Sequence, residues 1–175
     1  SGYKVIRAAR GDMDANGGYP YWATFSNLNS NAELLASTGE ITVYNATVSD
    51  GKLTLTKRSD KKVASGEGVL LKANSEYVNA KDISDEVSAA ATGDTHLVAT
   101  PKDAGIINAE TGYTLYRFTY NKVASKECLG FYLGVVGESK DGSQLKATPG
   151  KAYLKVSTQA ATEASTAKLA SGFAL

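Results

Sequence analysis

The sequence predicts an all-β protein: a β-sandwich of about ten short antiparallel strands with one or two short helical turns, with a closed β-barrel as the alternative fold. Short runs of β-branched and aromatic residues are separated by closely spaced Gly, Asn and Asp turn signals. Ten tyrosines, seventeen glycines and many Ser, Thr and Asn residues form a composition typical of extracellular β domains. A chain of 175 residues can bury one core, so residues 1–175 are expected to form a single domain.

An apparent internal repeat supports the same fold class. Residues 63–73 (VASGEGVLLKA) hold a glycine turn followed by an apolar run that is too short for a helix and reads as a buried strand. Residues 147–156 (ATPGKAYLKV) repeat this pattern, and the hydrophobic pair of each copy ends in Leu-Lys. Strand-like segments precede the two copies at 41–44 (ITVY) and 113–116 (YTLY). The pattern indicates an internal pseudo-repeat, two related β units that share one core.

Strands are expected where short runs of β-branched, aromatic or alternating residues are bounded by turn signals. These runs are residues 3–8, 21–25, 41–48, 53–57, 69–71, 96–99, 113–120, 129–136 and 152–156, followed by a last strand at 173–175. The clearest hairpin is predicted to join the third run to the fourth, because Asp50-Gly51 is a preferred two-residue turn.

Two segments predict short helical turns instead of strands. Residues 31–37 (NAELLAS) are rich in helix-forming residues, with Ser30 or Asn31 as the cap and Gly39 as the stop. Residues 82–91 (DISDEVSAAA) are expected to form the second. Residues 157–171 are almost entirely Ala, Ser and Thr without a clear period, and we expect a low-complexity segment on the surface.

Composition and charge argue against several classes of function. The formal net charge is +1, without the basic excess that nucleic-acid binding requires, so we expect no nucleic-acid partner. No apolar run approaches the roughly 20 residues that span a bilayer, so we expect no membrane insertion. The single cysteine, Cys128, excludes an internal disulfide and is interpreted as a buried hydrophobic residue, with a reactive thiol as the alternative.

Catalysis is the next class that the residues disfavour. His96 is the only histidine, and it is interpreted as a structural residue because it adjoins an apolar strand. Without a second histidine, the usual zinc sets and nucleophile–histidine pairs would all depend on this one side chain. A pair of carboxylates remains the alternative, since glycoside hydrolysis needs only two. Most acidic residues lie in turn-like contexts, so we expect no catalytic residues and no enzyme.

One loop suggests a metal site. Asp12, Asp14 and Asn16 alternate and are followed by Gly17, which matches the first half of a calcium-binding loop. The twelfth position of that pattern is Ala23 rather than Glu, so the bidentate ligand of an EF-hand is missing. A structural Ca²⁺ closed by distant residues is one interpretation. A polar turn that satisfies its own backbone is the other.

The aromatic residues Tyr19, Tyr21 and Trp22 are the first candidate binding surface. Aromatic rings stack on the C–H faces of sugars, and neighbouring polar side chains bind the sugar hydroxyls. Alternation along the strand places Tyr21 and Phe25 on one face and Trp22 on the other. If Tyr21 and Phe25 face the core, Trp22 lies outside and could pair with Tyr19 in the preceding loop. The alternative is that Trp22 packs in the core.

Tyr113 and Arg117 form a second candidate surface. Alternation over residues 113–120 places Tyr116, Phe118 and Tyr120 on one face, which we expect to be core. Tyr113 and Arg117 share the opposite face, roughly 13 Å apart at the rise of a strand, which is near the spacing of alternate sugar units.

Several phrases together resemble a known family. They are 22–25 (WATF), 43–48 (VYNATV), 66–72 (GEGVLLK), 130–132 (GFY) and 149–154 (PGKAYL). Their order and character resemble the β-rich accessory modules found near the C-termini of secreted Bacteroidetes proteins, including glycoside hydrolases and adhesin-like surface proteins. The resemblance covers about residues 22–156 and leaves out the N-terminal extension. It implies a secreted or cell-surface, non-catalytic role and transfers no functional residues.

Together these observations predict a carbohydrate-binding accessory module of a secreted polysaccharide-degrading enzyme. Its partner would be a plant polysaccharide of the β-glucan, xylan or mannan class, bound by aromatic stacking. We expect a monomeric module of a larger chain. A cell-surface adhesin or protein-interaction module, and an inert spacer domain, are the alternatives.

Overall fold

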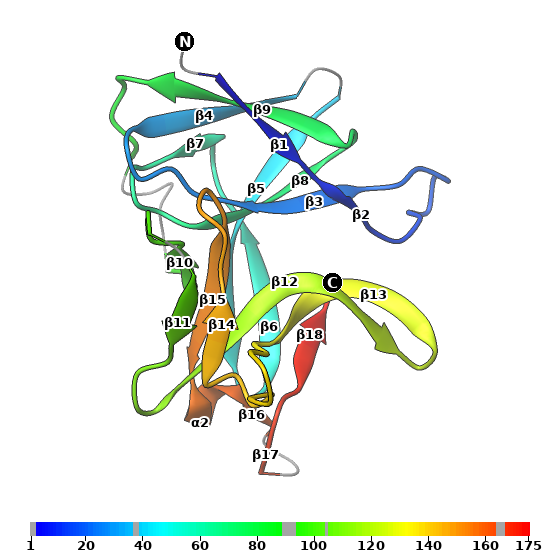
Figure 1. Cartoon of the computed structure of the whole chain (residues 1–175). Coiled ribbons are helices and arrows are strands. Elements are labelled where there is room, and N and C mark those ends of the chain that lie inside the picture. The colour runs from blue at the N-terminus through cyan, green and yellow to red at the C-terminus, as the bar shows by residue number, and fades with distance from the viewer. Residues whose placement is uncertain (1–2, 37–38, 89–93, 104, 164–166) are drawn as a thin grey trace.

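The computed structural model describes residues 3–36, 39–88, 94–103, 105–163 and 167–175. The protein is all-β, with 56% strand and 2% helix. Its strands form several antiparallel sheets, none of which closes into a barrel, so the predicted fold class is confirmed and the barrel alternative is wrong (Figure 1). Among the described residues, no helix is long and apolar enough to cross a lipid bilayer.

Three sheets make up most of the structure, each with its strands in order of pairing. The N-terminal sheet consists of β1 (Tyr3–Arg7), β9 (Tyr77–Ile83), β4 (Asn31–Ala36) and β7 (Lys62–Val63). The central sheet consists of β2 (Ala9–Arg10), β3 (Tyr21–Phe25), β8 (Val69–Ala73), β5 (Ile41–Ser49) and β6 (Lys52–Lys57). The C-terminal sheet consists of β10 (Leu97–Ala99), β15 (Ala152–Ser157), β12 (Tyr113–Val123), β13 (Lys126–Leu133) and β18 (Gly172–Ala174).

Two small strand pairs and one helix complete the elements that the structure describes. They are β11 (Ile106–Asn108) with β14 (Gln144–Lys146), β16 (Thr162–Glu163) with β17 (Lys168–Leu169), and α2 (Thr158–Ala161). Every predicted strand has a counterpart among these elements. The predicted hairpin is β5–β6, in which Asp50 and Gly51 have φ values of 51° and 71° and form the expected two-residue turn.

The central sheet is covered on both faces. Its strand β8 turns Val69 and Leu71 toward a core shared with the N-terminal sheet, and Leu70 toward a second core shared with the C-terminal sheet. All three side chains are fully buried. A strand buried on both faces needs apolar residues at successive positions rather than at alternate ones, which explains the uninterrupted run that the sequence contains.

The predicted pseudo-repeat is present in the strand pairing. Strands β3 to β8 pair in the order β3-β8-β5-β6, with β4 against β7. Strands β10 to β15 pair in the same pattern, β10-β15-β12-β13, with β11 against β14. The register pairs Tyr44 with Leu70 in one unit and Tyr116 with Leu154 in the other. The pairing therefore makes Leu70 of the first unit equivalent to Leu154 of the second. An alignment of the two Leu-Lys pairs in the sequence would instead match Leu71 with Leu154, which is off by one residue.

The glycine turns of the two units are also equivalent. Gly66 has φ 81° and Gly150 has φ 80°. In each turn the residue after the glycine donates its backbone N–H three residues back: Glu67 to the Ala64 carbonyl at 3.1 Å, and Lys151 to the Thr148 carbonyl at 3.3 Å. Both turns need a residue that tolerates positive φ, so glycine occupies the same corner twice.

The two predicted helical turns are wrong where the structure describes them. Residues 31–36 form strand β4, in which Ala32 and Leu34 are buried and alternate with more exposed neighbours. Pairing with β9 and β7 on either side overrides the helical preference of Ala, Glu and Leu, because the period-2 pattern fits the N-terminal core. Residues 82–83 end β9 and 84–88 contain no helix, while 89–93 lie outside the described residues.

The helix lies instead at the start of the Ala/Ser/Thr-rich segment. Ser157 caps α2 by accepting the Ala160 N–H with its side chain at 3.1 Å. Ala161 and Ala170 are buried in the core between the central and C-terminal sheets. The expectation of a surface segment at 157–171 is therefore wrong for these two residues. Their small side chains let the chain pass closely over the sheet.

Candidate functional site

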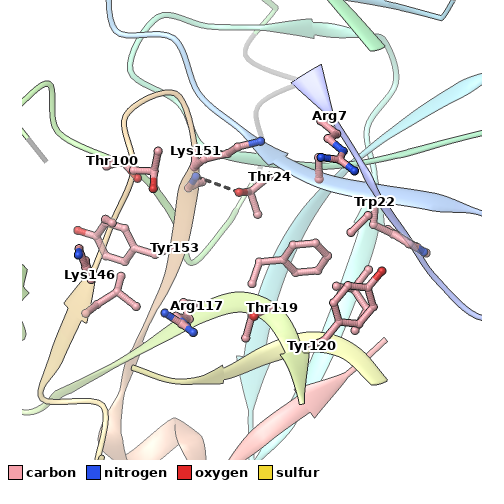
Figure 2. Close-up of a pocket in the computed structure, with 18 residues that line it drawn as sticks. Arg7, Trp22, Thr24, Thr100, Arg117, Thr119, Tyr120, Lys146, Lys151 and Tyr153 are labelled. Atoms are coloured by element: carbon pink, nitrogen blue, oxygen red, sulfur yellow. Dashed lines mark hydrogen bonds between the residues drawn. The ribbon is translucent and has the colours of Figure 1, made fainter. Parts of the chain in front are cut away.

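A groove of about 460 Å³ lies between β3 of the central sheet and β12 of the C-terminal sheet (Figure 2). Trp22 and Thr24 line it from β3, and Arg117, Thr119 and Tyr120 line it from β12. The end of β14 and the turn before β15 contribute further residues, among them Lys146, Thr148, Lys151 and Tyr153. The groove thus exists only because the two sheets pack together.

Trp22 lies on the boundary between the core and the groove. The neighbouring Ala23 and Phe25 are buried in the N-terminal core, and Tyr21 packs against that core, so Trp22 points to the opposite face as predicted. Its ring is half-buried against the other core, 5.9 Å from the Tyr44 ring between centroids. The two interpretations of Trp22 are therefore both partly met: it packs in the core and also lines the groove.

Tyr19 and Tyr21 lie outside this groove. Tyr19 is 39% exposed, and the Arg10 guanidinium carbon lies 4.5 Å from its ring centroid. The ring paired with Trp22 is that of Tyr44 rather than Tyr19. Tyr21 lines a separate hollow beside β2. The sequence therefore groups three aromatic residues that the structure places in three different surroundings.

The second predicted pair is also divided. Arg117 is exposed and lines the groove. Tyr113 is 41% exposed and lies elsewhere, with the Lys155 ammonium 4.4 Å from its ring centroid. Leu115 between them is buried in a small core under β11 and β14. The structure thus brings Arg117 together with Trp22, a combination drawn from the two separate candidate surfaces.

Tyr120 is an exposed aromatic residue of the groove that sequence reasoning missed. The alternation predicts it in the core with Tyr116, which is fully buried, but Tyr120 is 43% exposed and lines the groove. Its hydroxyl donates a hydrogen bond to the Arg10 carbonyl at 2.6 Å, which fixes the ring against the N-terminal segment. The sequence signal for an exposed Tyr120 was the polar end of the hairpin. Asn121 and Lys122 follow Tyr120 directly, where β12 extends past the core.

Lys151 is held firmly beside the groove by its backbone. Its carbonyl accepts the Ser26 hydroxyl at 2.5 Å and the Thr100 N–H at 3.0 Å. The next N–H, that of Ala152, donates to the Thr24 hydroxyl at 3.2 Å (Figure 2). Burial of the side chain lowers the pKa of Lys151, because desolvation penalises the charged ammonium. The protein therefore holds a partly desolvated cation next to the groove.

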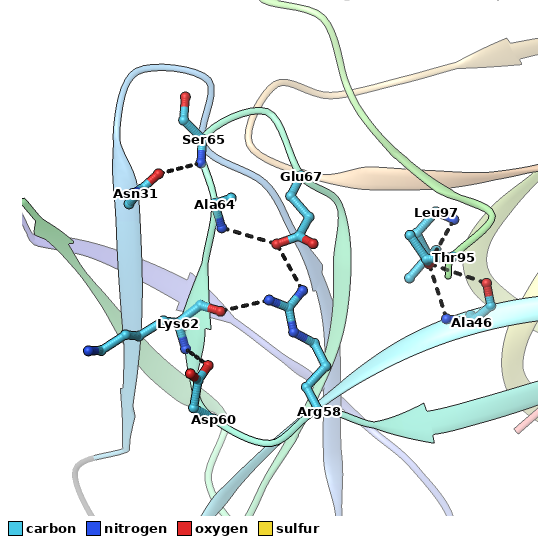
Figure 3. Close-up of polar contacts among 10 residues, drawn as sticks. All are labelled: Asn31, Ala46, Arg58, Asp60, Lys62, Ala64, Ser65, Glu67, Thr95 and Leu97. Carbon is cyan, nitrogen blue, oxygen red and sulfur yellow. Dashed lines mark hydrogen bonds and ion pairs between the residues drawn. The ribbon is translucent and has the colours of Figure 1, made fainter. Parts of the chain in front are cut away.

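The equivalent position in the first unit has a different environment. Glu67 follows Gly66 as Lys151 follows Gly150, but its carboxylate forms a buried ion pair with Arg58, Oε1 to Nη1 at 2.9 Å (Figure 3). The same oxygen accepts the Ala64 N–H at 3.0 Å, and Arg58 also donates to the Lys62 carbonyl at 2.8 Å. The Glu67 carboxylate therefore stabilises the fold through these contacts. Lys151 has no carboxylate within 4.0 Å in the part of the chain that the structure describes.

The possible calcium loop has the contacts of a self-satisfied turn. Asp14 Oδ1 accepts the backbone N–H groups of Asn16 at 2.9 Å and of Gly18 at 3.0 Å. The Asp12 carboxylate lies 3.2 Å from the Lys126 ammonium. Within the described ranges, no group of three or more His, Cys, Asp or Glu side chains could hold a metal ion. These contacts favour the polar-turn interpretation over a cation site, because one oxygen of Asp14 already accepts from the backbone and one oxygen of Asp12 is paired with Lys126.

The side chains most relevant to catalysis lie apart from the groove. His96 Nδ1 accepts the Val48 N–H at 2.9 Å. The backbone N–H of His96 donates to the Ala46 carbonyl, and its carbonyl accepts the Lys155 N–H. The ring therefore helps to anchor β10, which agrees with the structural interpretation. Cys128 is partly buried on β13.

Comparisons with protein-family models, with curated proteins and with solved structures found no match to this chain. The geometry of the groove therefore carries the functional argument.

Proposed function

We propose that this chain is a non-catalytic module that binds polysaccharide in the groove between β3 and β12. The observation that carries the proposal is the combination of two aromatic rings, Trp22 and Tyr120, with Arg117 and threonine hydroxyls in one preformed hollow. Sugar-binding sites need this combination, because flat rings cover the apolar sugar face while polar groups fix the hydroxyls.

Tyr120 is best suited to stack on a sugar ring. It is exposed at 43%, and its hydroxyl is held by the Arg10 carbonyl, so the ring loses little freedom on binding. Trp22 would contribute the part of its ring that faces the groove. Arg117 and the hydroxyls of Thr24 and Thr119 would contact the polar edge of the sugar.

The lining of the groove supports binding rather than hydrolysis. Among the described residues that line it, none is Asp, Glu, His or Cys. Glycoside hydrolysis depends on a pair of carboxyl groups on either side of the scissile bond. Without them in the lining, the groove can hold a chain but has no side chain suited to cleave it.

The resemblance to accessory modules of secreted Bacteroidetes proteins supports a role at the cell surface or outside the cell. A single shallow groove binds weakly, and attachment to a polysaccharide-degrading enzyme would raise the effective concentration of that enzyme on its substrate. We expect the module to act as a monomer within such a longer chain.

Affinity electrophoresis in gels that contain polysaccharide tests this proposal. The panel comprises β-glucan, xylan, mannan and their acidic counterparts. Retardation by at least one gel supports the proposal, and Tyr120→Ala should weaken that retardation by about tenfold, or about 1.4 kcal/mol. Tyr113→Ala is the matched control, since it removes an equally exposed tyrosine outside the groove. Migration that no gel retards would contradict sugar binding.

A protein-interaction module is the second candidate, favoured by one exposed surface. Tyr3 and Val5 on the edge strand β1 are 61% and 68% exposed, and Tyr77 on β9 is 55% exposed. An edge strand with apolar side chains can pair with an extended segment of another protein. If no gel retards the protein, this surface becomes the better candidate, whereas no particular feature favours an inert spacer.

A further inference from the structure

The groove is rich in hydrogen-bond donors and poor in acceptors. Its charged side chains are all cationic: Arg7, Arg117, Lys146 and Lys151. Arginine and lysine side chains can only donate. Among the described lining residues, the side chains that can accept are hydroxyls alone, and the Thr24 hydroxyl already accepts from Ala152.

A neutral sugar matches this set of groups less well than an acidic one. Each sugar hydroxyl both donates and accepts, so neutral-sugar sites benefit from carboxylate or amide oxygens that receive the sugar protons. No Asp, Glu, Asn or Gln is found among the described residues of the lining. A carboxylate or sulfate group, which only accepts, matches donor-only side chains and forms charge-assisted hydrogen bonds with them.

The cations of the groove also lack internal neutralisation. Only Arg7 has a carboxylate partner among the described residues, Glu76 at 2.7 Å from its Nε. Arg117, Lys146 and Lys151 have none within 4.0 Å. Lysines outside the groove, such as Lys52 and Lys57, also have no carboxylate within 4.0 Å among the described residues, so the groove is distinguished by a lining that includes cations and no acidic side chain.

From these donors and unpaired cations we propose that the groove binds an acidic polysaccharide, one that carries carboxylate or sulfate groups on its sugar rings. The proposal rests on the proposed function and specifies its ligand. Figure 2 shows Trp22 and Tyr120 at one end of the groove, with Arg117 and Lys146 toward the other. One sugar ring would contact the aromatic end while the acidic group of the same or the next ring meets the cations.

The experiment compares polymers that differ only in charge. Binding to polygalacturonate is measured by isothermal titration calorimetry against the same polymer after full methyl esterification, with dextran sulfate and dextran as a second pair. At low salt the charged member of at least one pair should bind about tenfold tighter than its neutral partner. Preference for polygalacturonate identifies the carboxylate, and preference for dextran sulfate identifies the sulfate.

Charge variants separate the groove from general attraction between the protein and a polyanion. The double variant Arg117→Gln/Lys146→Gln should weaken binding of the charged polymer by about tenfold or more. The control Lys52→Gln/Lys57→Gln removes two charges on β6, outside the groove, and should change binding less than about twofold. Equal losses in the two double variants would overturn the proposal, because binding would then follow net charge alone.

Two further outcomes distinguish this proposal from the proposed function. Equal affinity for charged and neutral polymers, or binding to neutral polymers only, would overturn the acidic ligand and leave polysaccharide binding intact. Binding to none of the four polymers and retardation by none of the gels above would overturn both.

Discussion

Gly66 and Gly150 occupy the same corner in two β units that have the same strand pairing, with φ values of 81° and 80°. Each lies in a turn closed by a hydrogen bond from the residue that follows it. Neither glycine is crowded, since a Cβ on Gly66 would meet no atom within 4 Å and one on Gly150 would meet only the Ser26 carbonyl at 4.0 Å. The requirement for glycine is therefore conformational.

The two turn glycines should accordingly respond alike to substitution. Gly66→Ala and Gly150→Ala should each lower the free energy of unfolding by about 1–2 kcal/mol, the cost of a left-handed backbone for an L-residue. Gly105→Ala is the control, because that position is also open but has no positive φ. Urea denaturation gives the three values. A loss at Gly105 as large as at the other two would contradict the conformational explanation.

Removal of one partner of the buried pair Arg58–Glu67 should lower the free energy of unfolding strongly, whereas replacement of both partners by apolar residues should lower it little. Glu67→Ala leaves the Arg58 guanidinium, whose side chain is 1% exposed, without its carboxylate. Loss of one partner of a buried pair costs about 3–5 kcal/mol. The double variant Arg58→Met/Glu67→Leu should recover most of that loss, because it leaves no unpaired charge. A double variant as unstable as Glu67→Ala would contradict this account.

Tyr116 should contribute stability through its hydroxyl as well as its ring. The hydroxyl donates to the buried Ala170 carbonyl at 2.8 Å, so Tyr116→Phe leaves that carbonyl unpaired and should cost about 1–3 kcal/mol. Tyr113→Phe, at an exposed position, should cost little. Chemical denaturation of the two variants gives the comparison.

Burial also makes the stability of the native protein sensitive to alkaline pH. It raises the pKa of Tyr116, Tyr132 and Tyr153. Below the ordinary tyrosine pKa of about 10, the phenol is protonated in both the folded and unfolded states, so the stabilisation is fully present. Above it, the unfolded state loses protons first and the free energy of unfolding falls. Tyr116→Phe should flatten this decline. An unchanged decline would assign the pH dependence to other groups.

Lys151→Met should separate stability from binding. The native ammonium is partly desolvated and burial lowers its pKa. Relative to the neutral amine, the charged form is therefore less favoured in the folded protein than in the unfolded chain. The variant should therefore gain thermal stability at neutral pH, and this gain should shrink as pH rises toward the ordinary lysine pKa. Binding of an acidic polysaccharide should weaken at the same time. A variant that is less stable at neutral pH would show that the charge has an unrecognised stabilising role.

Much of the fold could be predicted from local patterns because the strands and turns are determined locally. The Asp50-Gly51 hairpin and the alternation of Tyr21, Trp22 and Phe25 were both predicted correctly. Strand β4 was not, because its Ala, Glu and Leu residues favour a helix and only pairing with distant strands makes them extended.

The groove was the least predictable feature. It is formed where β3 and β12, from different sheets, come together, so no local pattern joins Trp22 to Arg117 and Tyr120. The sequence identified Trp22 and Arg117 as candidates but on separate surfaces. Lys146 and Lys151 carry no local signal at all, since their significance comes from what the packed sheets place near them.

The central sheet has a consequence for how the protein responds to heat. The two faces of strand β8 pack into two different cores. If one core unfolds, β8 is released and the other core loses the side chains that β8 contributes to it. Although the chain is wound from two similar units, we expect it to lose structure in one cooperative transition rather than unit by unit. A ligand bound in the groove would contact β3 of one unit and β12 of the other. Ligand binding should therefore raise the melting temperature of the whole molecule.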